Sequence, residues 1–333
     1  MRWRRVAVLL VLCLAALAGR GRADEERVAL AYPALSVSFT LPYLAEDLGL
    51  FQKEGLAVKH LDITGLGSIN ALISGSVEFA LASGLSLTRA AAKGQKLMAI
   101  AMLHDRLFVQ IVIRKSIADA AGFDPKAPLA KRAQILKGRT IAVDSINAVN
   151  HGYLRLVAKA GGIDPDSLNI AVMAPTSMPA AFAANQIDGF SMTPPWPEEP
   201  LTQGTAVLVA SAPDGDPPDL VPLANSVLLT RPDFCAKDES ACEKMGRAIG
   251  AAALIVRDHP DQALAALQKR FAKLDPKALA AAFEVLRKVT PMPPTPSLEA
   301  ISANDRFNVE AGLMQPSEEL KSFDGLFTDK YVH

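Results

Sequence analysis

Apolar residues follow two spacings that alternate along the first part of the chain. Residues 59–84 show this most clearly, because an alternating apolar stretch ends at Ile63 and apolar residues then recur at helical spacing after a glycine-containing turn. Gly75 is placed to end this helix, and residues 77–83 are apolar enough for a buried parallel strand. The pattern predicts a strand–helix–strand unit with Ser68 as the N-cap of its helix.

The same alternation continues on both sides of this unit and forms two groups. Residues 108–115 follow the preceding strand too closely for a helix to intervene, which predicts a crossing into a second lobe. Residues 220–230 are extended and are expected to carry the chain back, and the chain from Pro232 onward reads as helical. The predicted strands are 27–32, 58–63, 78–83 and 97–103 in the first group and 140–144, 168–173, 188–193 and 206–211 in the second.

An internal echo supports two lobes of like build. Residues 73–80 and 182–190 share the order helix end, polar turn, acidic residue and buried strand. The predicted fold class is therefore α/β, a two-lobe clamshell whose mixed, mostly parallel sheets are flanked by helices and joined by two crossover strands. The expected boundaries are 24–112 plus 225–333 for the first lobe and 113–224 for the second.

The N-terminus reads as a targeting segment. Three arginines fall within residues 1–5, residues 6–18 are all apolar, and the small residues Gly21 and Ala23 follow. This apolar run is short for a membrane span, so we predict a cleaved secretory signal peptide over residues 1–23, with an uncleaved anchor as the alternative. Cys13 lacks the small preceding residue of a lipoprotein site, so no lipid anchor is expected.

Removal of this segment leaves an acidic chain. Five of the 35 basic residues lie within it and none of the 35 acidic ones, which leaves 30 against 35. A chain without basic excess is not expected to bind nucleic acid. After Leu30 no apolar run reaches membrane-spanning length.

Two cysteines remain after the signal segment, Cys235 and Cys242. They lie close together in the sequence and would face an oxidising compartment, which favours a local disulfide over two free thiols. There is no Cys-x-x-Cys pair, so neither zinc binding nor thioredoxin-like chemistry is expected. We predict no metal site and no cofactor.

Four segments together resemble a known family. They are LAEDLGLFQKEGLAVKHLDITG, INALISGSVEFALASG, LKGRTIAVDS and AAFAANQIDGFSMTPPW. Over about residues 27–230 the chain resembles the periplasmic substrate-binding proteins of ABC importers, in particular the nitrate/sulfonate/taurine and thiamine-pyrimidine group. The resemblance implies the type II clamshell of such proteins, a periplasmic location, a monomer, and partners consisting of a membrane permease and its ATPase on separate chains.

The resemblance also implies that a small ligand lies between the lobes and is contacted by loops at strand ends. Serine, threonine and asparagine there supply neutral donors and acceptors, and a tryptophan offers a flat stacking surface. Carried over to this sequence, the ligand-binding residues are Ser36, Ser38, Gly65, Gly67, Ser68, Ser83, Gly84, His104, Asn147, Asn150, Thr176, Ser177 and Trp196.

Several of these residues also have a purely structural interpretation. The alternative for Gly65 and Gly67 is a role in the turn alone, for residues 145–150 and 176–177 it is helix capping, and for Trp196 it is core packing. His104 is equally compatible with a backbone-bonded loop residue. The neighbouring charges, namely Asp105, Arg106, Glu198 and Glu199, are expected to be solvated at the rim. No arginine is predicted to face the cleft, which disfavours nitrate or a sulfonate as ligand.

Two other functional classes remain open beside import. A sensing module could use the same clamshell without transport. An enzyme on this fold is disfavoured, because the related fungal thiamine-pyrimidine synthase needs a cysteine-rich iron motif that this chain lacks. No catalytic residue is predicted, since the sequence contains no G-x-S-x-G elbow, P-loop, dinucleotide fingerprint or zinc-binding helix motif.

Overall fold

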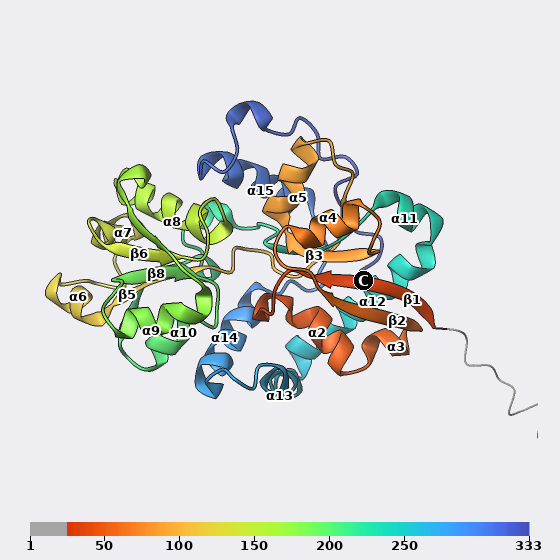
Figure 1. Ribbon diagram of the computed structural model, residues 1–333, viewed down its shortest axis with the longest axis horizontal. Coiled ribbons are helices and arrows are strands. Elements are labelled where there is room, and N and C mark those ends of the chain that lie inside the picture. Colours follow the sequence, from red (N-terminus) through yellow and green to blue (C-terminus); the bar gives the residue numbers. More distant parts are fainter. Residues whose placement is uncertain (1–24, 333) are drawn as a thin grey trace, which may run out of the picture.

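Two five-stranded sheets form the cores of two lobes that lie side by side (Figure 1). The computed structural model describes residues 25–332, so the predicted signal peptide over 1–23 lies outside the described residues. The first sheet has the order β2-β1-β3-β10-β4 and the second the order β7-β6-β8-β5-β9. The strands are β1 (Glu26–Tyr32), β2 (Leu56–Asp62), β3 (Phe79–Ser83), β4 (Met98–Met102), β5 (Gln110–Arg114), β6 (Thr140–Val143), β7 (Asn169–Val172), β8 (Gly189–Met192), β9 (Ala206–Ser211) and β10 (Ser226–Thr230).

One antiparallel strand is inserted into each sheet. β10 lies antiparallel between β3 and β4, and β5 lies antiparallel between β8 and β9. The other four strands of each sheet share one direction. Along the chain, β5 of the second sheet follows β4 of the first, and β10 of the first sheet follows β9 of the second. The two predicted crossings and the mixed, mostly parallel clamshell are therefore confirmed.

Helices cover both faces of the first sheet, because its strands carry apolar side chains on alternating sides. Leu30 and Leu81 pack beneath α2 and α12 on one face, whereas Ala31 and Ala80 pack beneath α4 and α5 on the other. The helices of this lobe are α2 (Thr40–Asp47), α3 (Leu50–Lys53), α4 (Gly67–Ile73), α5 (Gly84–Ala92), α11 (Pro232–Lys237), α12 (Glu239–Asp258) and α13 (Pro260–Arg270).

The second sheet is covered in the same way. Ile111 and Val143 pack against α7 and α8, whereas Val112 and Phe190 pack against α9 and α10. The helices are α6 (Lys115–Ala120), α7 (Leu129–Ala133), α8 (Val149–Ala160), α9 (Met178–Ala183) and α10 (Glu198–Thr202).

Two C-terminal helices connect the lobes. α14 (Pro276–Val289) lies below the passage between the lobes in Figure 1, and α15 (Leu298–Glu310) lies above it. On α14, Lys288 Nζ forms an ion pair with Asp214 Oδ1 of the second lobe at 2.8 Å. After α15, the Ala311 carbonyl accepts a hydrogen bond from Arg155 Nε of α8 at 3.0 Å. The C-terminal segment therefore packs on both lobes.

The internal echo has a physical basis in the structure. Glu78 Oε2 accepts the Ala29 amide at 2.7 Å, and Asp188 Oδ2 accepts the Thr140 amide at 2.9 Å. Each acidic residue thereby anchors the strand after it to the first parallel strand of its lobe. The preceding turns also correspond, since Gly75 and Asn185 both have a positive φ.

An arginine pair completes this correspondence, although the sequence analysis did not find it. Arg231, which follows β10, donates to the carbonyls of Leu72 and Val77 at 2.9 and 3.2 Å. Arg114, which ends β5, donates to the carbonyls of Phe182 and Ile187. The inserted strand of each lobe is thus tied to the helix end and turn of the echoed unit.

The predicted disulfide between Cys235 and Cys242 is confirmed and joins α11 to α12, with both cysteines buried. Among residues 25–332, none of the helices is both long and apolar enough to cross a bilayer. The same residues contain no cluster of histidine, cysteine and carboxylate side chains suited to a metal ion.

Candidate ligand-binding site

The two sheets turn corresponding edges toward each other. The parallel strands end at this edge in both lobes, and β5 and β10 begin there after their crossings. The crossings lie side by side, because the Leu223 amide donates to the Asp105 carbonyl at 2.7 Å and the Asn225 amide donates to the His104 carbonyl at 3.2 Å. Strand-end loops of both lobes therefore meet around one hinge, where ligands of open α/β sheets bind.

Serines at this edge of the first lobe bond mainly to one another. Ser36 Oγ caps the short helix 37–39 by accepting the Ser38 amide at 3.2 Å, and it donates to Ser38 Oγ at 3.1 Å. Ser83 caps α5 in the same way, since its Oγ accepts the Ser86 amide at 3.1 Å. These bonds fix the loops and satisfy much of their polar capacity.

The turn before α4 differs from its prediction in one respect. Ser68 is not the N-cap, because α4 already begins at Gly67 and its N-cap position is Leu66, which makes no side-chain cap. The Ser68 hydroxyl is instead buried and donates to the carbonyls of Gly65 and Leu81, at 3.1 and 3.4 Å. Gly65 has a positive φ of 60°, which explains a glycine in this turn.

Gly84 is held by close backbone packing. A Cβ atom at this position would lie 2.1 Å from the Ala224 carbonyl oxygen and 2.6 Å from Asn304 Nδ2. Its own amide donates to the Asn225 carbonyl at 3.2 Å. Gly84 therefore permits contact between α5, the returning crossing and α15.

His104 lies fully inside the hinge. Its ring packs against Phe108 with 4.8 Å between centroids, and Nδ1 lies 3.4 Å from Asn225 Nδ2. Burial lowers the pKa of His104 to about 3, so the imidazole is neutral at ordinary pH. A neutral His104 cannot attract an anion by charge.

The second lobe places its two predicted asparagines at the start of α8. Asn147 adopts a positive φ of 63°, and its carbonyl accepts a hydrogen bond from Arg89 Nη1 of α5 at 3.3 Å, which links the two lobes. Asn150 is buried and donates from Nδ2 to Asp144 Oδ1 at 2.9 Å. Its Oδ1 has no hydrogen-bond partner.

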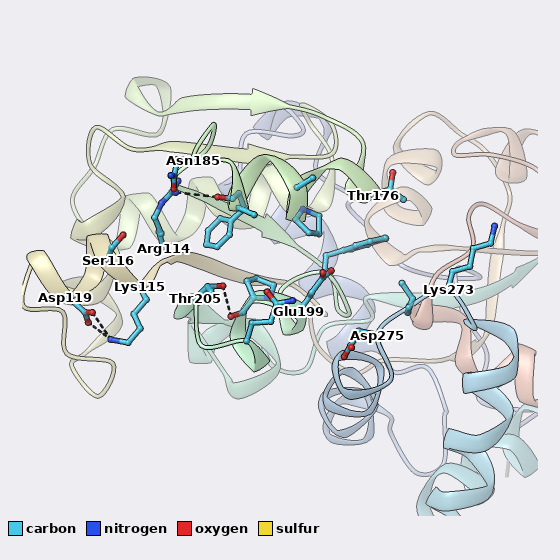
Figure 2. Close-up of a pocket in the computed structure, with 18 residues that line it drawn as sticks. Arg114, Lys115, Ser116, Asp119, Thr176, Asn185, Glu199, Thr205, Lys273 and Asp275 are labelled. Carbon is cyan, nitrogen blue, oxygen red and sulfur yellow. Dashed lines mark hydrogen bonds and ion pairs between the residues drawn. The ribbon is translucent and has the colours of Figure 1, made fainter.

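A cavity of about 1030 Å³ runs along α9 and α10 of the second lobe, from Arg114 and Lys115 at the far end of β5 to Trp196, and Figure 2 shows it. Thr176 and Trp196 line it from the second lobe, and residues 273–275 between α13 and α14 line it from the other side. Trp196 is half-buried and packs on the apolar cluster beneath α9, as the core-packing interpretation predicted, while its remaining surface lines the cavity. Ser177 precedes α9 without making a side-chain cap. Of the predicted ligand-binding residues, the described lining includes Thr176 and Trp196.

Two polar residues, Gln110 and Glu198, are buried at the cleft edge of the second lobe. The sequence analysis did not single out Gln110, and its prediction for Glu198 was wrong. Glu198 was expected to be solvated, but it is 3% exposed because α10 packs against α14. Burial raises the pKa of Glu198 to about 7, with small opposing effects from its own amide and from the Gln110 side chain. Both contacts fall short of hydrogen-bond geometry, so neither carboxylate oxygen is bonded. Gln110 could have been noticed as a polar residue that opens an apolar strand.

This architecture is the two-lobe fold of periplasmic binding proteins, and solved structures agree. The alkanesulfonate-binding protein SsuA from Xanthomonas axonopodis pv. citri, bound to MOPS, is 18% identical with a TM-score of 0.67, covering 90% of this chain and 97% of that one. The periplasmic aliphatic sulphonate binding protein SsuA from Escherichia coli is 16% identical with a TM-score of 0.70, covering 92% and 94%. The periplasmic nitrate-binding protein NrtA from Synechocystis PCC 6803 is 17% identical with a TM-score of 0.68, covering 92% and 87%.

The chain belongs to the NMT1/THI5-like family, whose sequence model matches residues 36–263. This match spans both lobes and the hinge. The predicted resemblance to substrate-binding proteins of ABC importers is thereby confirmed. No curated protein sequence matches the chain.

Proposed function

We propose that this protein is the solute-binding component of an ABC importer, which captures a small molecule between its lobes and delivers it to a membrane permease. The observation that carries the proposal is the meeting of polar strand-end loops from two like lobes around one hinge. The permease and its ATPase would be separate chains, and the binding protein would act as a monomer in the periplasm after loss of residues 1–23. We place the lobe boundaries at 24–112 plus 225–333 and at 113–224.

Ligand capture would proceed by a change in the balance between open and closed lobes. A ligand that contacts both edges binds the closed form better and so increases its population. The hydrogen bond from Arg89 to the Asn147 carbonyl joins the lobes and would favour the closed form. The site would hold its ligand without chemistry, consistent with neighbours that are named as binding proteins.

The predicted ligand-binding residues divide by the roles proposed for them. Asn147, Asn150, Thr176 and Trp196 would contact the ligand from the second lobe. Ser36, Ser38, Ser83 and His104 would form the opposing surface. The hydrogen bonds and packing of Gly65, Gly67, Ser68 and Gly84 support a role in shaping these loops rather than direct contact.

Intrinsic fluorescence offers a direct test of capture. The sequence contains two tryptophans, and Trp3 falls within the predicted signal peptide, which leaves Trp196 as the reporter in the processed chain. Titration with small organic cations, neutral amines, sulfonates and nitrate should yield a saturable fluorescence change for one class. X-ray scattering of the same samples should show a more compact particle when the ligand is bound.

Other outcomes would favour other functions. Binding without compaction would remove the clamshell mechanism, and turnover of the bound compound would indicate an enzyme. Trp196→Ala should weaken binding, and an unchanged affinity would place the ligand elsewhere. A permease and an ATPase encoded beside this chain would support import, whereas an adjacent sensor kinase would favour the sensing alternative.

A further inference from the structure

A row of unpaired acceptor oxygens follows the cleft edge of the second lobe. Its members are the side chains of Asn150, Gln110 and Glu198, which are 5%, 3% and 3% exposed. Asn150 Nδ2 lies 3.3 Å from the sulfur of Met192, and Met192 is the register partner of Gln110 in the sheet. The Gln110 side chain in turn adjoins the Glu198 carboxylate. The three residues are therefore contiguous across α8, β8, β5 and α10.

When Glu198 is ionised, every unpaired atom in this row is an acceptor. Asn150 Oδ1, Gln110 Oε1 and both Glu198 carboxylate oxygens have no hydrogen-bond partner. The orientation of Asn150 is fixed because its amide nitrogen donates to Asp144. The amide nitrogen of Gln110 is attracted by the carboxylate beside it, which turns Oε1 away. An ionised carboxylate offers only acceptors in any orientation.

Buried acceptors of this kind normally have a partner, because losing hydration without replacement destabilises the protein. The protein does not supply one here. Among the described residues Glu198 has no ion pair with lysine or arginine. The arginine of β5, Arg114, lies at the opposite end of that strand and is bonded to backbone carbonyls. The arginine near the rim, Arg89, is bonded to Asn147. A donor from outside the chain, either water or a ligand, would satisfy the row.

We propose that the ligand is a small organic cation, with an ammonium or amidinium group whose N–H donors bind the acceptor row formed by Asn150, Gln110 and Glu198. This inference rests on the proposed function, because it assigns the ligand class of the same cleft. An anion would face the acceptors of this row, whose three members carry no positive charge. A cation instead places its charge beside Glu198 and its N–H groups toward the amide oxygens.

The burial of Glu198 fits this role. Its raised pKa, about 7, shows that the apolar surroundings of α10 and α14 disfavour an isolated negative charge. An incoming cation offsets that cost and favours the ionised carboxylate. The site thereby gains from a ligand charge that no side chain of the described protein provides.

Size-matched probes of opposite charge test the proposal. Benzamidine with benzoate, and propylamine with propanesulfonate, form two such pairs, and nitrate serves as a small anion. The processed protein is titrated with each probe by Trp196 fluorescence and by thermal shift. We expect binding by at least one cation, and we expect Glu198→Gln to weaken it at least tenfold, which corresponds to about 1.4 kcal/mol. Gln110→Met should weaken it by a smaller factor.

The control variant is Glu284→Gln, which neutralises an exposed carboxylate on α14 and should leave cation binding unchanged. Binding of an anion, or equal cation binding by Glu198→Gln and the unaltered protein, would overturn the cationic ligand and leave solute capture intact. Failure of every probe to bind, or equal loss in Glu198→Gln and Glu284→Gln, would count against the site as well. Circular dichroism of each variant separates loss of binding from loss of fold.

Discussion

The two lobes share a backbone plan but differ in how their cleft edges satisfy polar groups. In the first lobe Ser36 bonds to Ser38, and Ser83 bonds to Ser86, so the hydroxyl groups of these loops have hydrogen-bond partners without a ligand. In the second lobe the Glu198 carboxylate has no partner on either oxygen. The strand-end serines of the first lobe therefore bond to one another, whereas the corresponding edge of the second lobe presents unpaired acceptors.

This difference indicates that the cleft edges of the two lobes have different roles. A self-bonded loop keeps its shape when the cleft opens, whereas unpaired buried groups gain most when a ligand arrives. The first lobe has exceptions, because the hydroxyl of Tyr32 and side-chain oxygens of Asn304, Asp305 and Asn308 on α15 are also buried without a partner. The Tyr32 ring, however, is stacked against Tyr43 and His60, with centroids 5.1 and 3.8 Å away. We attribute shape mainly to the first edge and ligand choice mainly to the second.

The largest expected effect on stability comes from a substitution at the cleft edge of the first lobe. Gly84→Ala would place a Cβ atom 2.1 Å from the Ala224 carbonyl oxygen, so the backbone of the returning crossing must move. We expect a loss of about 3 kcal/mol in the free energy of unfolding, measured by chemical denaturation. Gly67→Ala is the matched control, since its Cβ would meet only a side-chain carbon of Ile63 at 3.0 Å. Similar stability of the two variants would contradict a rigid first edge.

The pH dependence of stability tests the second edge. Folding raises the Glu198 pKa from 4.5 to about 7, so the folded protein disfavours the ionised form by about 3 kcal/mol. For this acid, stability is highest at low pH and decreases as pH rises from about 4.5 to about 7. Glu198→Gln should therefore unfold like the unaltered protein at pH 4 and be more stable by up to about 3 kcal/mol at pH 8.

The unligated protein is used for this measurement, because a bound cation would hide the effect. A Glu198→Gln variant that is less stable at pH 8 would mean that the carboxylate is already satisfied. The contrast between the two edges would then disappear. If Glu198→Gln is more stable at pH 8 and binds the ligand more weakly, the carboxylate destabilises the free protein but contributes to binding, as expected of a ligand site.

Removal of the disulfide between α11 and α12 tests whether ligand affinity is independent of this part of the first lobe. Cys235 and Cys242 are seven residues apart, and closing so short a loop stabilises by about 2.5 kcal/mol in the chain-entropy account. The double replacement by alanine should lower the free energy of unfolding by about that amount. Ligand affinity, measured by Trp196 fluorescence, should remain unchanged because α11 lies at the far end of the lobe (Figure 1). A changed affinity would extend the site beyond the cleft edges.

The sequence was sufficient to predict the strands, the crossings and the disulfide, because each depends on local spacing. The interval between Met102 and Gln110 is too short for a helix, and this alone indicates the change of lobe. The side chains of the site depend on distant packing instead. Glu198 and Glu199 are adjacent and chemically identical, yet α14 buries Glu198 and leaves Glu199 at the cavity.

Gly84 and Ser68 show the same limit. The proximity of Ala224 to Gly84 arises only when the chain returns from the second lobe. The hydroxyl of Ser68 bonds to the carbonyl of Leu81 rather than capping its own helix, because β3 lies beneath that turn. A pattern of serines and glycines therefore located the loops correctly but could not say which side chains face a ligand.

The smallest expected effect concerns the bond that joins the two edges. Arg89 donates to the Asn147 carbonyl at 3.3 Å in an exposed setting, so this bond should favour the closed form by about 0.5 kcal/mol. Arg89→Met keeps most of the side-chain stem and should weaken ligand binding two- to threefold by fluorescence titration. Arg257→Met, on an exposed stretch of α12, is the control and should have no effect. Weakening beyond tenfold would show that the first lobe also selects the ligand, and the assignment of different roles to the two edges would have to be abandoned.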